Sequence, residues 1–368
     1  MEHQFGRAAP FALGVEEELL LLDPATGALA PISSTLVPQV DTSAGTVMHD
    51  VYEALVETAS PISANAIEGT RSLETLRAEI RAAGATLAGA GIHPAAPFGD
   101  APHVVSERYR EIGDQMRGLL RRTPTCALHI HVGMPDPETT IRAFNRMRAH
   151  LPVLQALAAH SPFWHGIDSG FATARAQLFR GYPRADIPRA LADWADYEAT
   201  VGAIVDAGGV EDYTFLWWDI RPHPKLGTLE VRAMDAQARL GSVCGLAALV
   251  HGLVLASAHD ETTEAPVLRE VLIESSFRAG RDGLDASVWH DGALRPVRER
   301  AAAALALARP YARDTGAEDA LEEIDRILRE GNGAARMRAA HREGGMPRVL
   351  ARLIAESAEP LAAPASAA

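Results

Sequence analysis

The chain has 368 residues, of which 47% are hydrophobic and 23% are charged, a composition typical of globular proteins and not of disordered ones. Its 35 basic and 48 acidic residues give a net charge of −13, which argues against a nucleic-acid-binding surface and against a polybasic membrane anchor. The two cysteines, Cys126 and Cys244, are far apart, which excludes a thiolate zinc site and suits a reducing cytoplasm. Residues 1–10 contain no apolar run, so we expect no signal peptide and a cytoplasmic location.

Hydrophobic spacing predicts strands and helices in the first half of the chain. The predicted strands cover residues 11–22, 54–58 and 125–134, and the predicted helices cover 72–89, 104–121, 137–149 and 151–159. Residues 161–190 are rich in Gly, Pro and Arg and have weak periodicity. Because a long irregular segment inside a compact chain is usually functional, we expect this segment to contribute to a site.

The last third of the chain is predicted to be helical after one hairpin. The arms of that hairpin are expected at residues 213–221 and 228–235. Residues 241–258 contain no Lys, Arg, Asp or Glu, and a buried core helix is favoured over a membrane span because only one such segment occurs. The Ala- and Pro-rich residues 357–368 are expected to be a disordered tail. We therefore predict a single α+β domain over residues 1–356.

Three consecutive glutamates lie inside the first predicted strand, which is otherwise apolar. Because side chains alternate across a strand, Glu16 and Glu18 share one face and Glu17 points to the other. A carboxylate buried in such a strand is costly unless it is paired or bound to a cation. The residues alone leave open an edge strand with solvated glutamates or a metal or catalytic site.

His129 and His131 are two residues apart in the predicted strand 125–134, so both rings point to the same face. Two imidazoles on one face are a common metal arrangement, although such a pair also occurs as ordinary core or surface histidines. Glu57 lies at the end of the strand 54–58, and taken alone it favours an ordinary role.

Glu230 and Arg232 share one face of the predicted arm 228–235. Their charges either neutralise each other or form a metal ligand beside a phosphate clamp, since Arg offers a planar fork to phosphate oxygens. Arg175 lies in the irregular segment and Arg221 on the preceding arm. Both arginines are candidates for binding substrate, and both are also compatible with ordinary charge pairing.

The sequence lacks the common nucleotide-binding and nucleophile motifs. G-x-x-x-x-G-K-[ST], G-x-G-x-x-G and G-x-S-x-G are all absent. What remains is a set of four acids and two histidines on strands, which can line one face of one sheet. Mg²⁺ commonly bridges carboxylates to nucleotide phosphates, and an arginine beside it suits phosphoryl transfer.

At this point the sequence resembles the bacterial carboxylate–amine ligases, often called type 2 glutamate–cysteine ligases. The resemblance runs in order from about residue 11 to about residue 350 and is carried by GVEEELLLLD, LVETASP, LHIHVGMPD, SPFWHGIDSGFATAR, WWDIRPHPKLGTLEVRAMDAQ and FRAGRDGLDA. It implies a glutamine synthetase-like catalytic fold, in which an antiparallel sheet forms an open funnel with helices outside.

The resemblance also implies a reaction and a set of roles. ATP phosphorylates the side-chain carboxylate of glutamate, and an amine such as that of cysteine then attacks the acyl phosphate. The implied metal ligands for Mg²⁺ are Glu16, Glu18, Glu57, His129 and Glu230, with Glu16, Glu18 and Arg232 also contacting ATP through its metal. Arg232 would stabilise the transferring phosphoryl group, and His131 would lie beside the phosphates. Family habit implies a homodimer.

Two alternatives remain open at this stage, and one segment departs from the family pattern. A metal-dependent amidohydrolase would use the His-x-His pair, and a non-catalytic relative would bind glutamate or nucleotide without turnover. Ser276–Gly283 lacks the Asn and Trp usual in relatives, which leaves the contacts to the amine or nucleotide there open.

Overall fold

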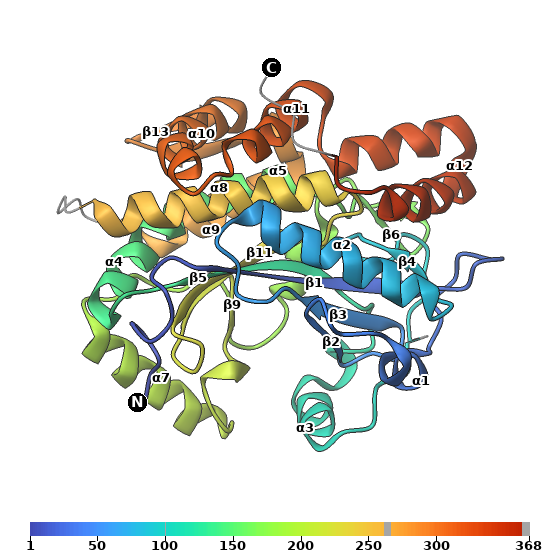
Figure 1. The fold of residues 1–368 in the computed structure, drawn as a ribbon, viewed down its shortest axis with the longest axis horizontal. Coiled ribbons are helices and arrows are strands. Elements are labelled where there is room, and N and C mark those ends of the chain that lie inside the picture. Colours follow the sequence, from blue (N-terminus) through green and yellow to red (C-terminus); the bar gives the residue numbers. More distant parts are fainter. Residues whose placement is uncertain (100, 261–265, 363–368) are drawn as a thin grey trace.

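A computed structural model describes residues 1–99, 101–260 and 266–362. A seven-stranded antiparallel sheet lies in the middle of the molecule, and most of the long helices lie on one side of it (Figure 1). This arrangement confirms the predicted α+β class with an antiparallel sheet and outer helices. A single domain over residues 1–356 stays a prediction.

The sheet brings together strands that are far apart in the sequence. Its order is β10-β11-β5-β1-β3-β2, and β4 pairs with β1. The strands are β1 (Leu13–Leu22), β2 (Thr46–His49), β3 (Leu55–Ala59), β4 (Thr86–Ala88), β5 (Ala127–Gly133), β10 (Ile220–His223) and β11 (Thr228–Asp235). Short pairs complete the strands: β6 (Phe163–Trp164) with β7 (Ile167–Asp168), β8 (Ala185–Asp186) with β9 (Trp217–Trp218), and β12 (Ser287–His290) with β13 (Ala293–Pro296).

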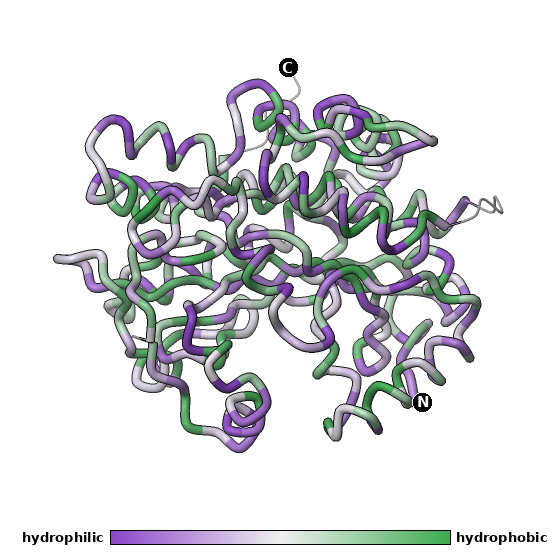
Figure 2. The backbone as a smooth tube through the Cα atoms, turned by 180° about the vertical axis from the view of Figure 1, so that it is seen from behind, coloured by the Kyte–Doolittle hydropathy of each residue, from purple (hydrophilic) through white to green (hydrophobic). Residues whose placement is uncertain are grey.

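The helices bury apolar stripes against the sheet and against one another. They are α1 (Ser33–Leu36), α2 (Ala66–Ala82), α3 (Glu107–Met116), α4 (Pro137–Met147), α5 (Leu151–Ala158), α6 (Ala174–Phe179), α7 (Trp194–Gly208), α8 (Leu240–His259), α9 (Arg269–Asp282), α10 (Val297–Asp314), α11 (Glu322–Glu330) and α12 (Gly333–Ala358). Outer helices alternate hydrophilic and hydrophobic stretches along the chain (Figure 2), as expected of elements that are half in solvent.

Helix α8 is the central helix of the core, as its lack of charge predicted. It packs against α2, α4 and α10 and against strand β5. By length and composition it is the one helix of the described residues that is apolar enough to cross a membrane, but 94% of that apolar window is buried inside the protein. The interpretation of 241–258 as a buried core helix is therefore confirmed.

The predicted helix over 72–89 is wrong at both ends. Helix α2 begins after Asn65, whose side-chain oxygen accepts hydrogen bonds from the backbone N–H groups of Ile67 and Glu68. It ends at Ala82, because Gly84 adopts a φ of +97° that stops the helix and turns the chain into β4. Residues 86–88 thus form a strand beside β1. This strand was not predicted, because Leu87 continues the helical spacing of the apolar residues before it.

Two further expectations for the last third need correction. The β12–β13 hairpin interrupts the region predicted to be helical after residue 241. The predicted tail at 357–368 begins too early, because Ser357 lies in α12, is 1% exposed and its hydroxyl accepts a hydrogen bond from the backbone N–H of Gly89. Residues 363–368 of that tail lie outside the described residues.

Candidate active site

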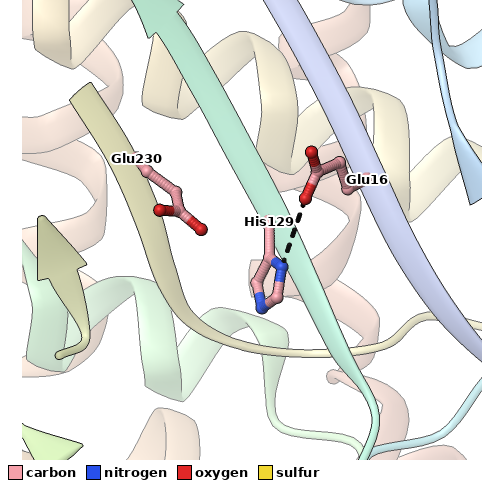
Figure 3. A group of neighbouring side chains, drawn as sticks. All are labelled: Glu16, His129 and Glu230. Carbon is pink, nitrogen blue, oxygen red and sulfur yellow. Dashed lines mark ion pairs between the residues drawn. The ribbon is translucent and has the colours of Figure 1, made fainter. Parts of the chain in front are cut away.

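Two groups of candidate metal-ligand side chains lie on the face of the sheet opposite α2. We name them the histidine group, which consists of Glu16, His129 and Glu230, and the carboxylate group, which consists of Glu18, Asp50 and Glu57. Within each group the ligand atoms lie within 4.8 Å of one another. The side chains of the histidine group come from three neighbouring strands and point toward one another (Figure 3).

The strand register explains why these residues meet. Glu16 of β1 lies directly opposite His129 of β5, and Glu18 of β1 lies directly opposite Glu57 of β3. Directly opposed side chains in an antiparallel pair are close neighbours on one face. Glu230 of β11 lies opposite His131 on the other side of β5, which brings a third strand to the same face.

Glu16 links both histidines of the His-x-His pair. Its two carboxylate oxygens lie 3.6 Å from Nδ1 of His129 and 3.3 Å from Nε2 of His131. Burial alone would raise the pKa of Glu16, but His131 and His129 hold it below its ordinary value. Burial, together with the charge of Arg232, lowers the pKa of His129 to about 4, so its imidazole is neutral and able to bind a metal.

Glu230 is held between two arginines. It is 1% exposed and accepts hydrogen bonds from Nε of Arg221 and from Nη1 of Arg232. Although burial opposes ionisation, these two guanidinium groups hold the pKa of Glu230 well below its ordinary value. The carboxylate is therefore ionised, and it orients both arginines along the sheet.

The carboxylate group has the opposite electrostatic character. Burial and the charge of Asp50 raise the pKa of Glu18 to about 8, and burial raises the pKa of Asp50 to about 6. Burial, with Glu16 and Glu18 nearby, raises the pKa of Glu57 well above its ordinary value. Among the described residues, neither Asp50 nor Glu57 forms an ion pair. Three crowded carboxyls with raised pKa values are the pattern expected of a cation site.

Both groups line one cavity of about 370 Å³. Arg175, Arg221 and Arg232 also line it, as does His131. His131 is oriented by a 3.0 Å contact between its Nδ1 and the hydroxyl of Thr228, which leaves Nε2 directed at the carboxylates. The structure thus brings every candidate site residue of the sequence analysis to a single cavity, while the roles assigned to them stay predictions.

Glu17 lies on the other face of β1, as its alternation predicted. It is 1% exposed, and both its oxygens accept hydrogen bonds from the fully buried guanidinium of Arg77 on α2, at 2.8 and 2.6 Å. Arg77 also donates to the backbone carbonyls of Gln237 and Ala238, just after β11. Arg77 therefore joins helix α2 to strand β1 through Glu17 and to the end of β11 through the two carbonyls.

Several residues of the cavity escaped the sequence analysis. Asp50 follows β2, a strand that was not predicted, and it reaches the site because Met48 of β2 lies opposite Glu57. Arg108 and Tyr109 reach the cavity from helix α3, and His223 from the end of β10. Only the isolated acid after a short Thr-Val-Met-His run was a usable signal for Asp50.

The residues present fit Mg²⁺ by donor chemistry. The two groups supply five carboxylates and one neutral imidazole, and hard divalent cations prefer oxygen ligands. Nε2 of His129 and Nε2 of His131 are buried without a hydrogen-bond partner, although each faces a glutamate carboxylate, so both atoms are available to a ligand. His129 is the one histidine in these two candidate groups of the described residues, which disfavours the amidohydrolase alternative built on a pair of metal-binding histidines.

Adding Mg²⁺ is expected to raise the melting temperature, and by more at pH 8 than at pH 6. Glu18 and Asp50 have folded pKa values of about 8 and about 6, above their ordinary values of 4.5 and 3.8. The folded protein therefore binds these protons more tightly than the unfolded chain, and this contribution to stability decreases as the pH rises toward 8. Mg²⁺ needs deprotonated ligands, so its stabilisation grows over the same range.

Differential scanning calorimetry with matched ionic strength checks this expectation. At 100 times the dissociation constant, a ligand of the folded state adds about 2.7 kcal/mol to the free energy of unfolding. NaCl at equal ionic strength is the control. An equal shift with NaCl, or a Mg²⁺ shift that shrinks between pH 6 and pH 8, would contradict the assignment.

Comparisons with known proteins show the family of the chain. The model of glutamate–cysteine ligase family 2 matches residues 12–352. A Rubrobacter xylanophilus protein whose name places it among the type 2 glutamate–cysteine ligases is 37% identical over 94% of both chains. A protein of Halobacterium salinarum named glutamate–cysteine ligase is 38% identical over 75% of this chain and 80% of its own.

Solved structures show the same fold at low sequence identity. The glutamate–cysteine ligase of Francisella tularensis, solved in complex with AMP, has a TM-score of 0.73 at 12% identity over 95% of this chain and 90% of that one. The ligase PafA, solved in complex with the ubiquitin-like protein Pup, has a TM-score of 0.56 at 10% identity over 95% of this chain and 72% of that one.

The fold is glutamine synthetase-like, and the family match places the chain in the class of carbon–nitrogen ligases. Its sheet carries acidic and imidazole side chains on one face, beside arginines that suit the oxygens of a nucleotide. Within that class, the chain belongs to glutamate–cysteine ligase family 2, an ATP-dependent carboxylate–amine ligase family.

Proposed function

We propose that this protein is an ATP- and Mg²⁺-dependent ligase that joins the side-chain carboxylate of glutamate to an amine, such as that of cysteine, through a γ-glutamyl phosphate. The observation that supports the proposal most directly is the pairing of two candidate metal groups with Arg232 in one cavity. Phosphoryl transfer depends mainly on positioning and on neutralising charge, and this cavity offers both.

The proposal assigns the metal ligands by group. The histidine group and the carboxylate group would hold Mg²⁺, with Glu16 and Glu18 adjoining the nucleotide through its metal. Bound there, Mg²⁺ supplies charge neutralisation for phosphate oxygens. Asp50 joins the five ligands proposed from the sequence, because its oxygen lies within 4.8 Å of those of Glu18 and Glu57.

The cationic side chains of the cavity have separate roles in the proposal. Arg232 is held by Glu230 through Nη1, and its Nε is buried without a hydrogen-bond partner. That free N–H donor would stabilise the transferring phosphoryl group. Burial alone would lower the pKa of His131, but Glu16 and Glu230 raise it above its ordinary value. A partly protonated imidazole at this position would donate from Nε2 to a phosphate oxygen.

The two arginines predicted to bind substrate, Arg175 and Arg221, have different roles in the proposal. Arg175 lines the cavity, and its Nε is also buried without a hydrogen-bond partner, so it is available to an anionic oxygen. Arg221 donates Nη1 to the backbone carbonyls of Thr214 and Leu216 while Nε binds Glu230. Among the described residues its donors are largely engaged, so its proposed contribution is to fix Glu230 and the wall of the cavity.

The names of the relatives support the choice of substrates. The Halobacterium protein is named for glutamate and cysteine, and the Francisella enzyme was solved with AMP. The proposal names the acceptor only as an amine, because Ser276–Gly283 lacks the Asn and Trp usual in relatives. This segment lies in helix α9 and the turn after it. A homodimer and a cytoplasmic location are carried forward from the sequence as proposals.

An assay of ADP formation with a panel of amines tests the proposed function. ADP release is expected only when glutamate, Mg²⁺ and a suitable amine are present together, and mass spectrometry should show the γ-glutamyl amide of that amine. ADP release that ignores glutamate with every amine would overturn the proposal. Binding of glutamate or nucleotide without any turnover would favour the non-catalytic alternative instead.

A further inference from the structure

One buried carboxylate next to the cavity is not explained by metal binding. Asp235 ends strand β11, three residues after Arg232, and is 2% exposed. It does not line the cavity and belongs to neither candidate metal group of the described residues. Both of its carboxylate oxygens are nevertheless used, which indicates a specific task for the charge.

Asp235 binds the irregular segment that follows helix α5. Its Oδ2 accepts hydrogen bonds from the hydroxyl of Ser161 at 2.7 Å and from the backbone N–H of His160 at 2.8 Å. Its Oδ1 accepts a hydrogen bond from the hydroxyl of Thr173 at 2.9 Å. The same Oδ1 lies 3.8 Å from Nη1 of Arg175, and this ion pair is almost fully buried.

These contacts converge on the start of helix α6, where Arg175 is located. Thr173 caps that helix by accepting a hydrogen bond from the backbone N–H of Ala176. The hydroxyl of Ser161 also accepts a hydrogen bond from the backbone N–H of Arg175. Asp235 therefore fixes the position of both the backbone and the guanidinium of Arg175 relative to β11. Strand β11 also carries Glu230 and Arg232.

The backbone of Gly91 passes close to the carboxyl group of Asp235. A Cβ on Gly91 would lie 2.5 Å from Cγ of Asp235 and 2.7 Å from its Oδ2, so only glycine lets the chain pass there. On the other side, the side chain of Arg175 reaches the cavity, where its charge helps to offset the raised pKa of Glu18. Asp235 holds one edge of the guanidinium, and the unpartnered Nε is left for a ligand.

We propose that Asp235 is a positioning residue that aims Arg175 at an anionic oxygen of a substrate in this cavity, without touching the substrate itself. The proposal rests on the proposed function, since it concerns the same cavity. The anionic oxygen belongs either to a carboxylate of glutamate or to a phosphate of ATP. Because an ion pair of fixed geometry orients a guanidinium, loss of Asp235 weakens binding of that substrate more than it slows turnover.

Steady-state kinetics of Asp235→Asn test this inference. The KM for one anionic substrate is expected to rise about 10-fold or more while kcat changes less than about 3-fold, and the substrate whose KM rises identifies the ligand of Arg175. Glu323→Gln is the control, because Glu323 does not line this cavity and instead pairs with Arg326 and accepts a hydrogen bond from the hydroxyl of Ser242. It should leave both KM values unchanged.

A double-mutant cycle separates positioning from a general loss of structure. In an Arg175→Met background, Asp235→Asn should add little to the KM effect, since the residue acts through Arg175. Additive effects, unchanged KM values for both substrates, or a fall in kcat alone would overturn the inference. If Asp235→Asn does not fold, Thr173→Val, which removes the hydrogen bond to the same Oδ1, is expected to raise the same KM, and no change would overturn the inference.

The outcome is distinguishable from a failure of the proposed function. If the wild-type protein forms no ADP with any amine, the proposed function fails, and the same cycle is then read as dissociation constants for glutamate and ATP by calorimetry. Loss of affinity for one of these two ligands in Asp235→Asn, absent in the Arg175→Met background, would support the positioning role. Equal affinity in all variants would overturn it.

Discussion

Glu57→Gln is expected to lower ADP formation at least about 100-fold, since loss of a metal ligand removes several kcal/mol of charge stabilisation and each 1.36 kcal/mol is a tenfold change in rate. The melting temperature of the metal-free protein is expected to be close to that of the wild type. Burial, with the charges of Glu16 and Glu18 nearby, raises the pKa of Glu57 well above its ordinary value, so the metal-free fold favours the neutral acid. Glutamine is a neutral side chain of the same size, and the substitution is therefore expected to cost the metal-free fold little stability.

Glu57 separates a metal role from a structural role better than Glu230 does. Substitution of Glu230 would leave the buried Arg221 and Arg232 without their common counter-charge, so loss of activity could follow from misfolding. Glu53→Gln is the matched control, because Glu53 lies four residues earlier and accepts hydrogen bonds from Ser34 outside the cavity. ADP assays and calorimetry on both variants check the prediction. Near-normal activity of Glu57→Gln would refute its metal role.

Glu17→Gln is expected to lower the free energy of unfolding by about 3–5 kcal/mol, the usual cost of leaving one partner of a buried ion pair uncompensated. Glu17 and Arg77 are both fully buried as side chains, and the pair is joined by two hydrogen bonds. Glutamine retains one oxygen acceptor but removes the charge that balances Arg77. Urea unfolding followed by circular dichroism measures the loss.

A double variant tests whether the missing charge is the cause. Glu17→Gln with Arg77→Met removes both charges and should recover part of the lost stability, because the buried guanidinium is no longer uncompensated. Recovery will be partial, since Arg77 also donates to the carbonyls of Gln237 and Ala238. If the free energy of unfolding of Glu17→Gln stays within about 1 kcal/mol of the wild-type value, the Glu17–Arg77 ion pair contributes little to stability.

The contrast between Glu57 and Glu17 follows from their places on the sheet. Glu57 and Glu18 lie on one face in direct cross-strand opposition, whereas Glu17 lies between Glu16 and Glu18 in sequence but points to the helices. One face therefore concentrates carboxylates that suit a cation. On the other face, the guanidinium of Arg77 neutralises the single carboxylate of Glu17. The excess of 13 acidic charges in the sequence says nothing about this division, because net charge carries no positions.

Local patterns were sufficient where the determining interaction is local. Alternation along a strand correctly separated Glu17 from Glu16 and Glu18, because adjacent residues of any strand point to opposite faces. The absence of charge over residues 241–258 correctly predicted a buried helix. The motifs that resemble the carboxylate–amine ligases led to the right family, since residues 12–352 match its model.

Where the local signal was ambiguous, the predictions failed. Apolar residues at 86–88 continue the helical spacing of α2, but Gly84 with its φ of +97° ends the helix and lets that run pair with β1. The β12–β13 hairpin and strand β2 are only four residues per strand, too short for periodicity to separate them from neighbouring turns. Asp50 was missed together with β2, because its place in the carboxylate group depends on that strand.

The sequence by itself determined the family, the antiparallel α+β class, and that Glu17 points to the opposite face of its strand from Glu16 and Glu18. Family and class follow from the motifs, and the placement of Glu17 follows from the two-residue period of a strand. Only the tertiary structure decided that Asp50 joins Glu18 and Glu57, that Arg77 neutralises Glu17, and that Asp235 holds Arg175. The physical reason is distance along the chain. Asp50 lies 32 residues from Glu18, Arg77 lies 60 residues from Glu17, and Asp235 lies 60 residues from Arg175, so only strand pairing and helix docking bring these charges within interaction distance.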